Sequence, residues 1–283
     1  MKLLFRCPVC KNRHARGPVN GFNVYRCLYC GEAHRLLVHR PGERRVLTAS
    51  IPRFLPTLQE LAPLFLGDVF IHLDTQPFRP RQVRPPHELK LLGRSHRLSL
   101  EPCSAYTPLN AVVPKSGFSQ EILTRMEESG YSGKLFDHLA SAIQIFDTRR
   151  HYNNLSDLNI QLLDIVVLYL GSVPGSRIKA SSAVAAPRSP CVEGLIGFCK
   201  EFDCNTIILG EEKEPETNVQ KFNAQGIEVQ WLDTATMPAS CLSKLNLLDT
   251  MLRPTFESDA FSLWCAHRFT ESHAWASTRQ TTL

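Results

Sequence analysis

Residues 46–74, VLTASIPRFLPTLQELAPLFLGDVFIHLD, contain the pattern that decides the fold. The β-like run at 46–51 predicts a strand, and Leu58–Leu66 predicts a helix. A second apolar run, Val69–Leu73, predicts a short buried strand that ends at Asp74. A strand, a helix and a strand in this order predict two parallel strands that a right-handed crossover joins.

The same alternation continues along the rest of the chain. Helices are predicted at 119–129, 133–146, 155–170, 191–202, 216–225 and 241–252, and strands at Arg177–Ser181, Thr206–Leu209 and Glu228–Trp231. We therefore expect residues 46–283 to form an α/β domain, with a mainly parallel sheet layered between flanking helices. The polar tail 266–283 is expected to be disordered or frayed.

Small polar and acidic residues follow several of the predicted strands. Ligands of parallel sheets bind beyond the carboxyl ends of the strands, which draws attention to Asp74, Ser181, Ser182 and the turn at 210–211. Asp74 suits a general base or an acceptor of a hydrogen bond from an amine. The alternative interpretation is an acid that only caps a turn.

Residues 79–97 are rich in proline and arginine. The prolines exclude a regular helix and predict a stiff, extended loop. Guanidinium groups on such a loop suit bidentate binding of phosphate, whereas a solvated surface loop is the alternative. The basic residues here are Arg79, Arg81, Arg84, Lys90, Arg94 and Arg97, and the only acid is Glu88.

Two Cys-x-x-Cys pairs stand at the N-terminus, sixteen residues apart: Cys7 and Cys10, then Cys27 and Cys30. This spacing predicts a zinc ribbon over residues 1–45, with one tetrahedral Zn²⁺ between four thiolates. The spacer has room for a strand out and a strand back, so we expect a β-hairpin between the pairs. Four thiolates leave no open position, which makes the zinc structural, and so small a module needs the metal to fold. A redox dithiol is the alternative.

The remaining six cysteines show no metal-type spacing, and we expect them to be small buried hydrophobic side chains. The longest strongly apolar stretch, Ile165–Leu170, is far shorter than the ~20 residues of a membrane span. The N-terminus also lacks the apolar run of a signal peptide. We therefore expect a soluble, cytoplasmic protein in which paired thiols stay reduced.

The net charge of +5 is unevenly distributed. Residues 1–45 contain ten Lys and Arg and two acids, a balance of +8, which leaves −3 for the rest of the chain. A basic ribbon surface suits a nucleic acid or another polyanion, because binding releases counterions. The alternative is a solvated face. Nucleotide-binding glycine loops and the Gly-x-Ser-x-Gly motif are absent from the sequence, so nucleotide cofactors and a serine hydrolase mechanism have no support.

Residues from about 46 to 255 resemble the WbqC-like family in three ordered segments. The first contains Pro52-Arg53-Phe54-Leu55-Pro56, Asp68-Val69-Phe70 and Asp74-Thr75-Gln76; the second is LSDLNIQLLDIVVLYLGSVPGSRIKASSA; the third comprises GLIGFCKEFDCNTIILG and NAQGIEVQWLD. The family is associated with the biosynthesis of O-antigen and other surface polysaccharides. The resemblance implies transfer of an amine, amino acid or acyl group to a phosphate-containing activated substrate such as a nucleotide sugar.

The resemblance and the strand ends together select the candidate site residues. They are Asp74, Gln76 and Asn159 for catalysis, and Arg53, Arg79, Arg81, Lys90 and Ser181 for binding of the phosphate-containing substrate. Three departures from the family pattern stand out. The segment 77–90, PFRPRQVRPPHELK, keeps basic residues and Lys90 but lacks the Asn-Arg pair of the family. Ser50-Ile51-Pro52 replaces His-Gln-Pro, and the acidic turn at 210–213 replaces a glycine-rich one. They favour either an altered site or a loss of activity.

Two other functions compete with this one. In the first, the basic ribbon holds a nucleic acid while the α/β domain modifies a DNA base. In the second, the chain is a non-catalytic adaptor, and the ribbon binds a nucleic acid or a protein.

Overall fold

A computed structural model of the chain describes residues 3–6, 13–16, 24–26, 33–35, 44–78, 86–91, 94–104, 106–148, 154–169, 176–183, 192–209 and 216–232. Its centre is a five-stranded sheet with the order β11-β10-β5-β6-β9, in which all neighbouring strands are parallel. The strands are β5 (Val46–Ser50), β6 (Val69–His72), β9 (Ser176–Lys179), β10 (Thr206–Leu209) and β11 (Glu228–Trp231). The predicted parallel sheet is confirmed.

The predicted helices are also present, each with bounds within two residues of those expected. They are α1 (Leu58–Leu66), α2 (Phe118–Glu128), α3 (Lys134–Thr148), α4 (Leu155–Tyr169), α5 (Val192–Glu201) and α6 (Glu216–Asn223). The predicted helix at 241–252 and the tail 266–283 lie outside the described residues. Within the described part of the chain, no helix is both long enough and apolar enough to cross a membrane.

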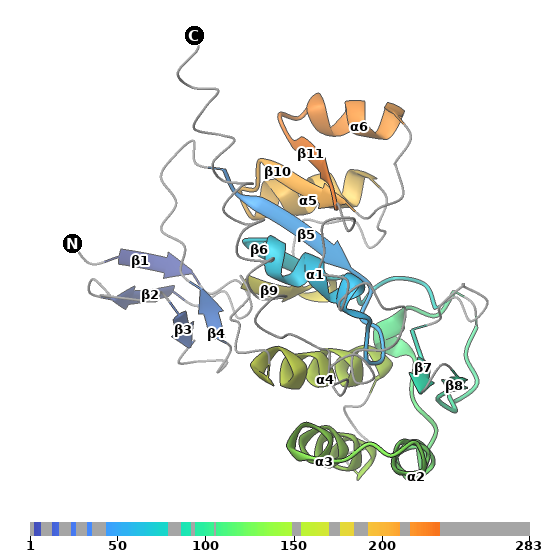
Figure 1. The fold of residues 1–283 in the computed structure, drawn as a ribbon. Helices are drawn as coiled ribbons and strands as arrows, with labels where there is room; N and C mark the ends of the chain where they lie inside the picture. The colour runs from blue at the N-terminus through green and yellow to red at the C-terminus, as the bar shows by residue number, and fades with distance from the viewer. Residues whose placement is uncertain are drawn as a thin grey trace.

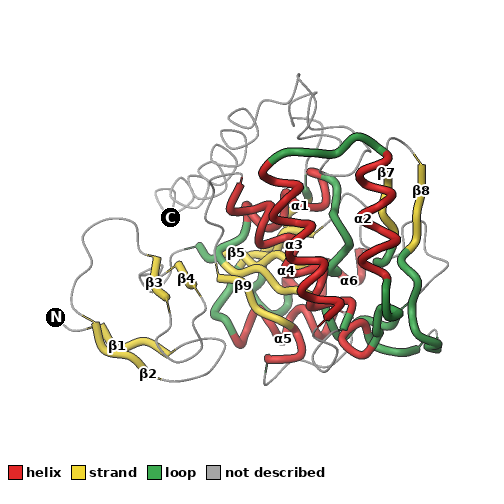
Figure 2. The backbone as a smooth tube through the Cα atoms, turned by 90° about the horizontal axis from the view of Figure 1, so that it is seen from below, coloured by secondary structure: helices red, strands yellow, loops and turns green. Residues whose placement is uncertain are grey.

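Helices cover both faces of the sheet (Figure 1). Alternate strand residues face opposite sides: Val46 and Phe70 pack in the core with α1 to α4, whereas Leu47 and Val69 pack with α5 and α6. In Figure 2, which views the molecule from below, α3 and α4 lie side by side over the sheet. Burial on both faces explains the nearly continuous apolar character of these strands.

The turn between β5 and α1 is firmly fixed. Thr57 caps α1: its hydroxyl accepts from the Glu60 backbone N–H at 3.3 Å, while the Glu60 carboxylate accepts from the Thr57 N–H at 2.9 Å. This is the reciprocal capping box that the spacing Thr-x-x-Glu favours. Phe54 and Leu55 are completely buried. At the other end of α1, a Cβ on Gly67 would lie 2.4 Å from Thr48 Oγ1, so only glycine fits there.

One predicted loop contains regular structure. Strands β7 (Glu88–Leu91) and β8 (Arg94–Arg97) form an antiparallel hairpin in the segment for which an extended loop was expected. The prolines end before the hairpin begins. Leu89 is fully buried, and the Ser95 hydroxyl donates to the Glu88 carboxylate at 2.8 Å. A buried leucine and a cross-strand hydrogen bond therefore stabilise paired strands here.

The N-terminal strands pair differently from the expectation. Strand β1 (Leu3–Arg6) pairs with β2 (Arg13–Arg16), and β3 (Val24–Arg26) pairs with β4 (Ala33–Arg35), both antiparallel. The expected hairpin across the sixteen-residue spacer is therefore wrong, because β2 and β3 belong to separate two-stranded sheets. The four cysteines Cys7, Cys10, Cys27 and Cys30 lie outside the described residues, and the zinc site stays a prediction.

Three of the six later cysteines lie in the described part of the chain. Cys199 and Cys204 are buried, as predicted, and burial raises the pKa of the Cys199 thiol to about 12. Cys103 is exposed, contrary to expectation, because it lies in a surface loop.

Candidate functional site at the carboxyl edge of the sheet

Asp74 and Ser181 meet at the carboxyl edge, where β6 and β9 lie side by side. Asp74 is 1% exposed and follows β6, whereas Ser181 is exposed and lies in the short 3-10 turn Ala180–Ser182 after β9. One oxygen of the Asp74 carboxylate accepts from the Ser181 backbone N–H at 2.9 Å. The other accepts from the Ser181 hydroxyl in a short hydrogen bond. The two residues that the strand ends selected are thus in direct contact.

This contact fixes the polarity of the Ser181 hydroxyl. Its only hydrogen points to the buried Asp74 carboxylate. The lone pairs of Oγ therefore lie on the side that faces away from Asp74. A hydroxyl held in this way accepts a hydrogen bond from a donor such as an amine. Asp74 itself is enclosed, and both of its oxygens are engaged. Both contacts that its oxygens make are to Ser181, so Asp74 can reach a ligand only through that residue.

A loop from another part of the chain holds the residues after β6 in place. The backbone carbonyl of Asp74 accepts from Asn110 at 2.9 Å, and that of Gln76 accepts from Leu109 at 2.9 Å. The Gln76 side chain is 8% exposed, and its amide nitrogen has no hydrogen-bond partner among the described residues. A buried amide that lacks a partner is a donor available to a ligand or to water.

Asn159, on α4, joins two loops at the same edge. It is 1% exposed, and its side-chain nitrogen donates to the carbonyls of Pro52 at 3.0 Å and Pro86 at 3.1 Å. Both amide hydrogens are thereby used, which leaves the amide oxygen without a partner within the described part of the chain. Asn159 therefore links the turn after β5 to Pro86, which lies two residues before β7.

The phosphate-binding candidates are only partly placed. Arg53 is half-buried, and its Nε lies 3.2 Å from the Glu60 carboxylate, so an acid already engages this guanidinium. Arg79 and Arg81 lie outside the described residues. Lys90 lies in β7, but its side chain is not described. Phosphate binding by these residues stays a prediction.

Two ion pairs tie the edge strand β9 to α4. Arg177 pairs with Asp164, and Lys179 Nζ lies 2.5 Å from Asp157. Beside them, His72 on β6 is 2% exposed. Burial, together with the nearby charges of Arg177 and Lys179, lowers the pKa of His72 to about 3. The imidazole is therefore neutral at pH 7, and its Nε2 has no partner among the described residues.

The buried His72 makes stability depend on pH. Its pKa is about 3 in the folded protein and 6.5 in the unfolded chain, so the unfolded state binds the extra proton as pH falls below 6.5. We expect His72 to reduce the free energy of unfolding by about 2 kcal/mol between pH 8 and pH 5. Urea unfolding at both pH values should show a smaller loss for His72→Gln. Equal losses in His72→Gln and the wild type would contradict the assignment.

Among the described residues, no group of three or more His, Cys, Asp or Glu could hold a metal ion. Sequence reasoning found Asp74, Ser181, Gln76 and Asn159, but missed the segment at 109–110 that holds the first of them. These contacts use backbone groups, and no sequence motif marks them.

Comparison with known proteins gives one match. A model described as the WbqC-like protein family matches residues 52–247, a range that contains β6, α4, β9 and their site residues. No curated protein and no solved structure matches the chain.

Proposed function

This chain belongs to the WbqC-like family, since the match spans well over half of its length, and we propose that it is a group-transfer enzyme acting at the carboxyl edge of the sheet. The observation that carries this proposal is the hydroxyl of the exposed residue Ser181, whose hydrogen the buried Asp74 carboxylate accepts. A pair of this kind receives a proton from an amine that is reacting, and a parallel sheet commonly places its ligand at this edge.

The proposed substrate is a phosphate-containing activated compound such as a nucleotide sugar, and the second reactant is an amine or amino acid. The amine nitrogen forms a bond to the activated carbon. The bond from that carbon to the phosphate oxygen breaks, and its electron pair leaves with the phosphate. The nitrogen gives its proton to Ser181 Oγ as the Ser181 proton moves to Asp74. Arg79, Arg81 and Lys90 are proposed to bind the phosphate.

A product assay tests the proposal. The full-length protein is incubated with a panel of nucleotide sugars and free amino acids, and mass spectrometry detects conjugates that have lost the nucleotide. We expect a conjugate from the wild type and very little from Ser181→Ala. Ser182→Ala is the matched control, because the Ser182 hydroxyl donates to the Lys179 carbonyl at 2.7 Å instead of to Asp74. Equal product from both variants would refute the role of Ser181.

A second version of the function has a nucleic acid as the substrate. The concentration of positive charge in residues 1–45, a balance of +8, favours it. In this version, Cys7, Cys10, Cys27 and Cys30 bind a structural Zn²⁺, and the basic module holds the polymer while the α/β domain modifies a base. Zinc then supports the fold of the module and takes no part in the transfer.

Replacement of Arg13, Arg16, Arg26 and Arg35 by glutamine separates the two versions. These residues belong to β2, β3 and β4. If the substrate is a nucleic acid, the quadruple variant should lose turnover of the polymer and retain its metal content. Unchanged turnover of the polymer would remove this second version.

A further inference from the structure

The ring of Tyr106 is almost fully exposed to solvent. Its relative exposure is 88%, whereas the other exposed large hydrophobic side chains in the described part of the chain, Val113 and Ile145, are 41% and 46% exposed. Aromatic rings supply large contact areas, and tyrosine is enriched at surfaces where one end of the side chain is apolar and the other is wet. A ring that is this exposed is available to stack against a ligand.

The turn that carries Tyr106 is fixed by several hydrogen bonds. The Thr107 backbone N–H donates to the Ser104 carbonyl at 3.1 Å, and the Ser104 N–H donates to Thr107 Oγ1 at 3.0 Å. The Tyr106 N–H donates to Ser104 Oγ at 3.3 Å. Tyr106 occupies the third position of this turn, so its backbone is ordered while its ring remains in solvent. Because the backbone is already ordered, stacking on the ring costs little conformational entropy.

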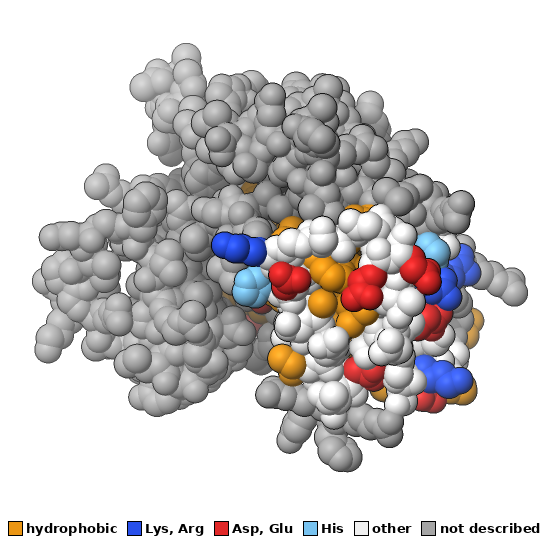
Figure 3. Space-filling model, turned by 60° about the horizontal axis from the view of Figure 1, so that its bottom comes forward, with side chains coloured by type: hydrophobic (Ala, Val, Ile, Leu, Met, Phe, Trp, Pro, Cys, Tyr) orange, Lys and Arg blue, Asp and Glu red, His pale blue; other side chains and the backbone are white. Residues whose placement is uncertain are grey.

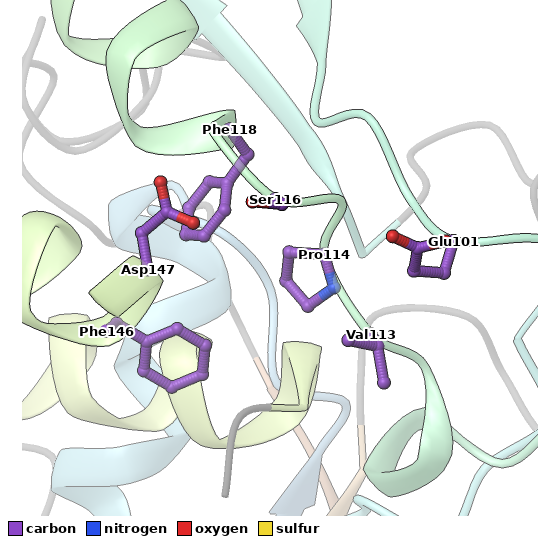
Figure 4. A pocket seen from close by; sticks show the side chains of 7 residues that line it. All are labelled: Glu101, Val113, Pro114, Ser116, Phe118, Phe146 and Asp147. Carbon is purple, nitrogen blue, oxygen red and sulfur yellow. The ribbon is translucent and has the colours of Figure 1, made fainter. Parts of the chain in front are cut away.

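The loop around this turn is also closed at its base. The Glu101 backbone N–H donates to the Val113 carbonyl at 2.9 Å, and Figure 4 shows these two residues on neighbouring segments of the chain. Leu100 and Pro114 form an isolated antiparallel bridge next to them. Tyr106 therefore lies on a loop that is held at its base as well as at its turn.

The same loop lies along the segment that follows Asp74. At one end, the Asn110 N–H donates to the Asp74 carbonyl at 2.9 Å, and at the other, the Phe78 N–H donates to the Thr107 carbonyl at 2.7 Å. Tyr106 is next to Thr107 and four positions from Asn110, so its Cα lies at most about 14 Å from that of Asn110. Tyr106 therefore lies at the far end of a segment that begins at the proposed transfer site.

We propose that the Tyr106 ring stacks on the base of a nucleotide-containing substrate. This inference rests on the proposed function and names the part of the substrate that the α/β domain recognises. Arg79 and Arg81, which are proposed to bind the phosphate, follow Phe78 closely in the sequence. In a nucleotide sugar, the phosphates separate the reacting carbon from the base. With the carbon at Ser181 and the phosphates at the two arginines, the base lies towards the Tyr106 end of the segment.

A single planar ring fits Tyr106 better than a protein surface does. A specific protein interface buries about 800 Å² on each partner, whereas this turn offers one large ring close to the polar Ser104 and the acidic Glu101. In Figure 3 the described hydrophobic side chains of the face shown lie among charged and polar ones. Every base has a face that stacks on an aromatic ring, so we expect Tyr106 to accept purines and pyrimidines alike.

Calorimetric titration of the full-length protein with UMP, AMP and ribose 5-phosphate tests the inference. The three compounds share a phosphate and a ribose, but only the nucleotides have a base. We expect each nucleotide to bind about 5- to 150-fold more tightly than ribose 5-phosphate, as the stacking of one base implies. Equal affinities of the nucleotides and ribose 5-phosphate, or no binding of any of them, would overturn the inference.

Variants of Tyr106 assign the effect to the ring. Tyr106→Ala should bind UMP no more tightly than ribose 5-phosphate, and its affinity for ribose 5-phosphate should not change. Tyr106→Phe retains the ring and should bind UMP within about twofold of the wild type. Because the side chain is exposed, both variants should fold as the wild type does. Unchanged affinity of Tyr106→Ala for UMP would contradict stacking on this residue.

Failure of the stacking and failure of the transfer give different results. If UMP binds through Tyr106 but no nucleotide sugar yields a conjugate, the transfer is refuted and the stacking is retained. If a conjugate forms and Tyr106→Ala leaves the KM for the nucleotide sugar unchanged, the stacking is refuted and the transfer is retained.

Discussion

Asp74→Asn should reduce the transfer rate by about 10- to 100-fold without unfolding the protein, as the loss of one charge-assisted hydrogen bond in the transition state implies. The asparagine oxygen still accepts from the Ser181 backbone N–H, so the turn after β9 is retained. The asparagine nitrogen, however, donates to Ser181 Oγ and turns the hydroxyl hydrogen outward. A hydroxyl hydrogen that points outward donates a hydrogen bond to the amine nitrogen. This bond engages the lone pair with which the nitrogen must attack the activated carbon, so the transfer slows.

The pattern across variants distinguishes this mechanism from simple damage. Asp74→Asn combined with Ser181→Ala should be no slower than the slower single variant, since the two residues act as one unit. The thermal unfolding of Asp74→Asn should stay close to that of the wild type. If Asp74→Asn and Ser181→Ala both retain full activity in the conjugate assay, the catalytic proposal fails and the non-catalytic adaptor becomes the better hypothesis.

Phe54→Ala should reduce the free energy of unfolding by about 3–5 kcal/mol, the range for truncation of a fully buried phenylalanine. Phe54 is 0% exposed, and its backbone N–H donates to the Pro86 carbonyl at 3.0 Å. The same carbonyl accepts from Asn159. A cavity at Phe54 therefore disturbs the hydrogen-bonded contact between the turn after β5 and the segment that precedes β7. Urea unfolding measured by circular dichroism gives the change.

Tyr106→Ala is the matched control for this experiment. Tyr106 is also aromatic, but it is 88% exposed, and its loss should change stability by less than about 0.5 kcal/mol. A loss of stability in Phe54→Ala as small as that in Tyr106→Ala would mean that Phe54 is not part of the packed core.

The sheet could be predicted because its signals are local. The run Val69–Leu73 and the short strand Thr206–Leu209 are apolar on both faces, which only a covered parallel sheet explains. The rule that ligands lie beyond strand ends then placed Asp74 and Ser181 together, although 107 positions separate them in the sequence.

The remaining contacts depend on groups that carry no sequence pattern. Asn159 is a candidate for catalysis from the sequence, yet its nitrogen binds the carbonyls of Pro52 and Pro86, and any residue supplies a carbonyl. The β7–β8 hairpin was missed because the prolines before it dominated the interpretation.

The strand order has a consequence for synthesis on the ribosome. Val46 of β5 pairs with Thr206 of β10, which is translated 160 residues later. The central strand β5 therefore cannot pair with β10 until that part of the chain has been made. At ~5–20 residues per second this delay is about 8 to 32 s, during which one side of β5 has unpaired amide and carbonyl groups. The nascent chain is therefore most prone to wrong strand pairing before residue 206 emerges, and a chaperone that shields β5 during this interval should raise the yield of folded protein.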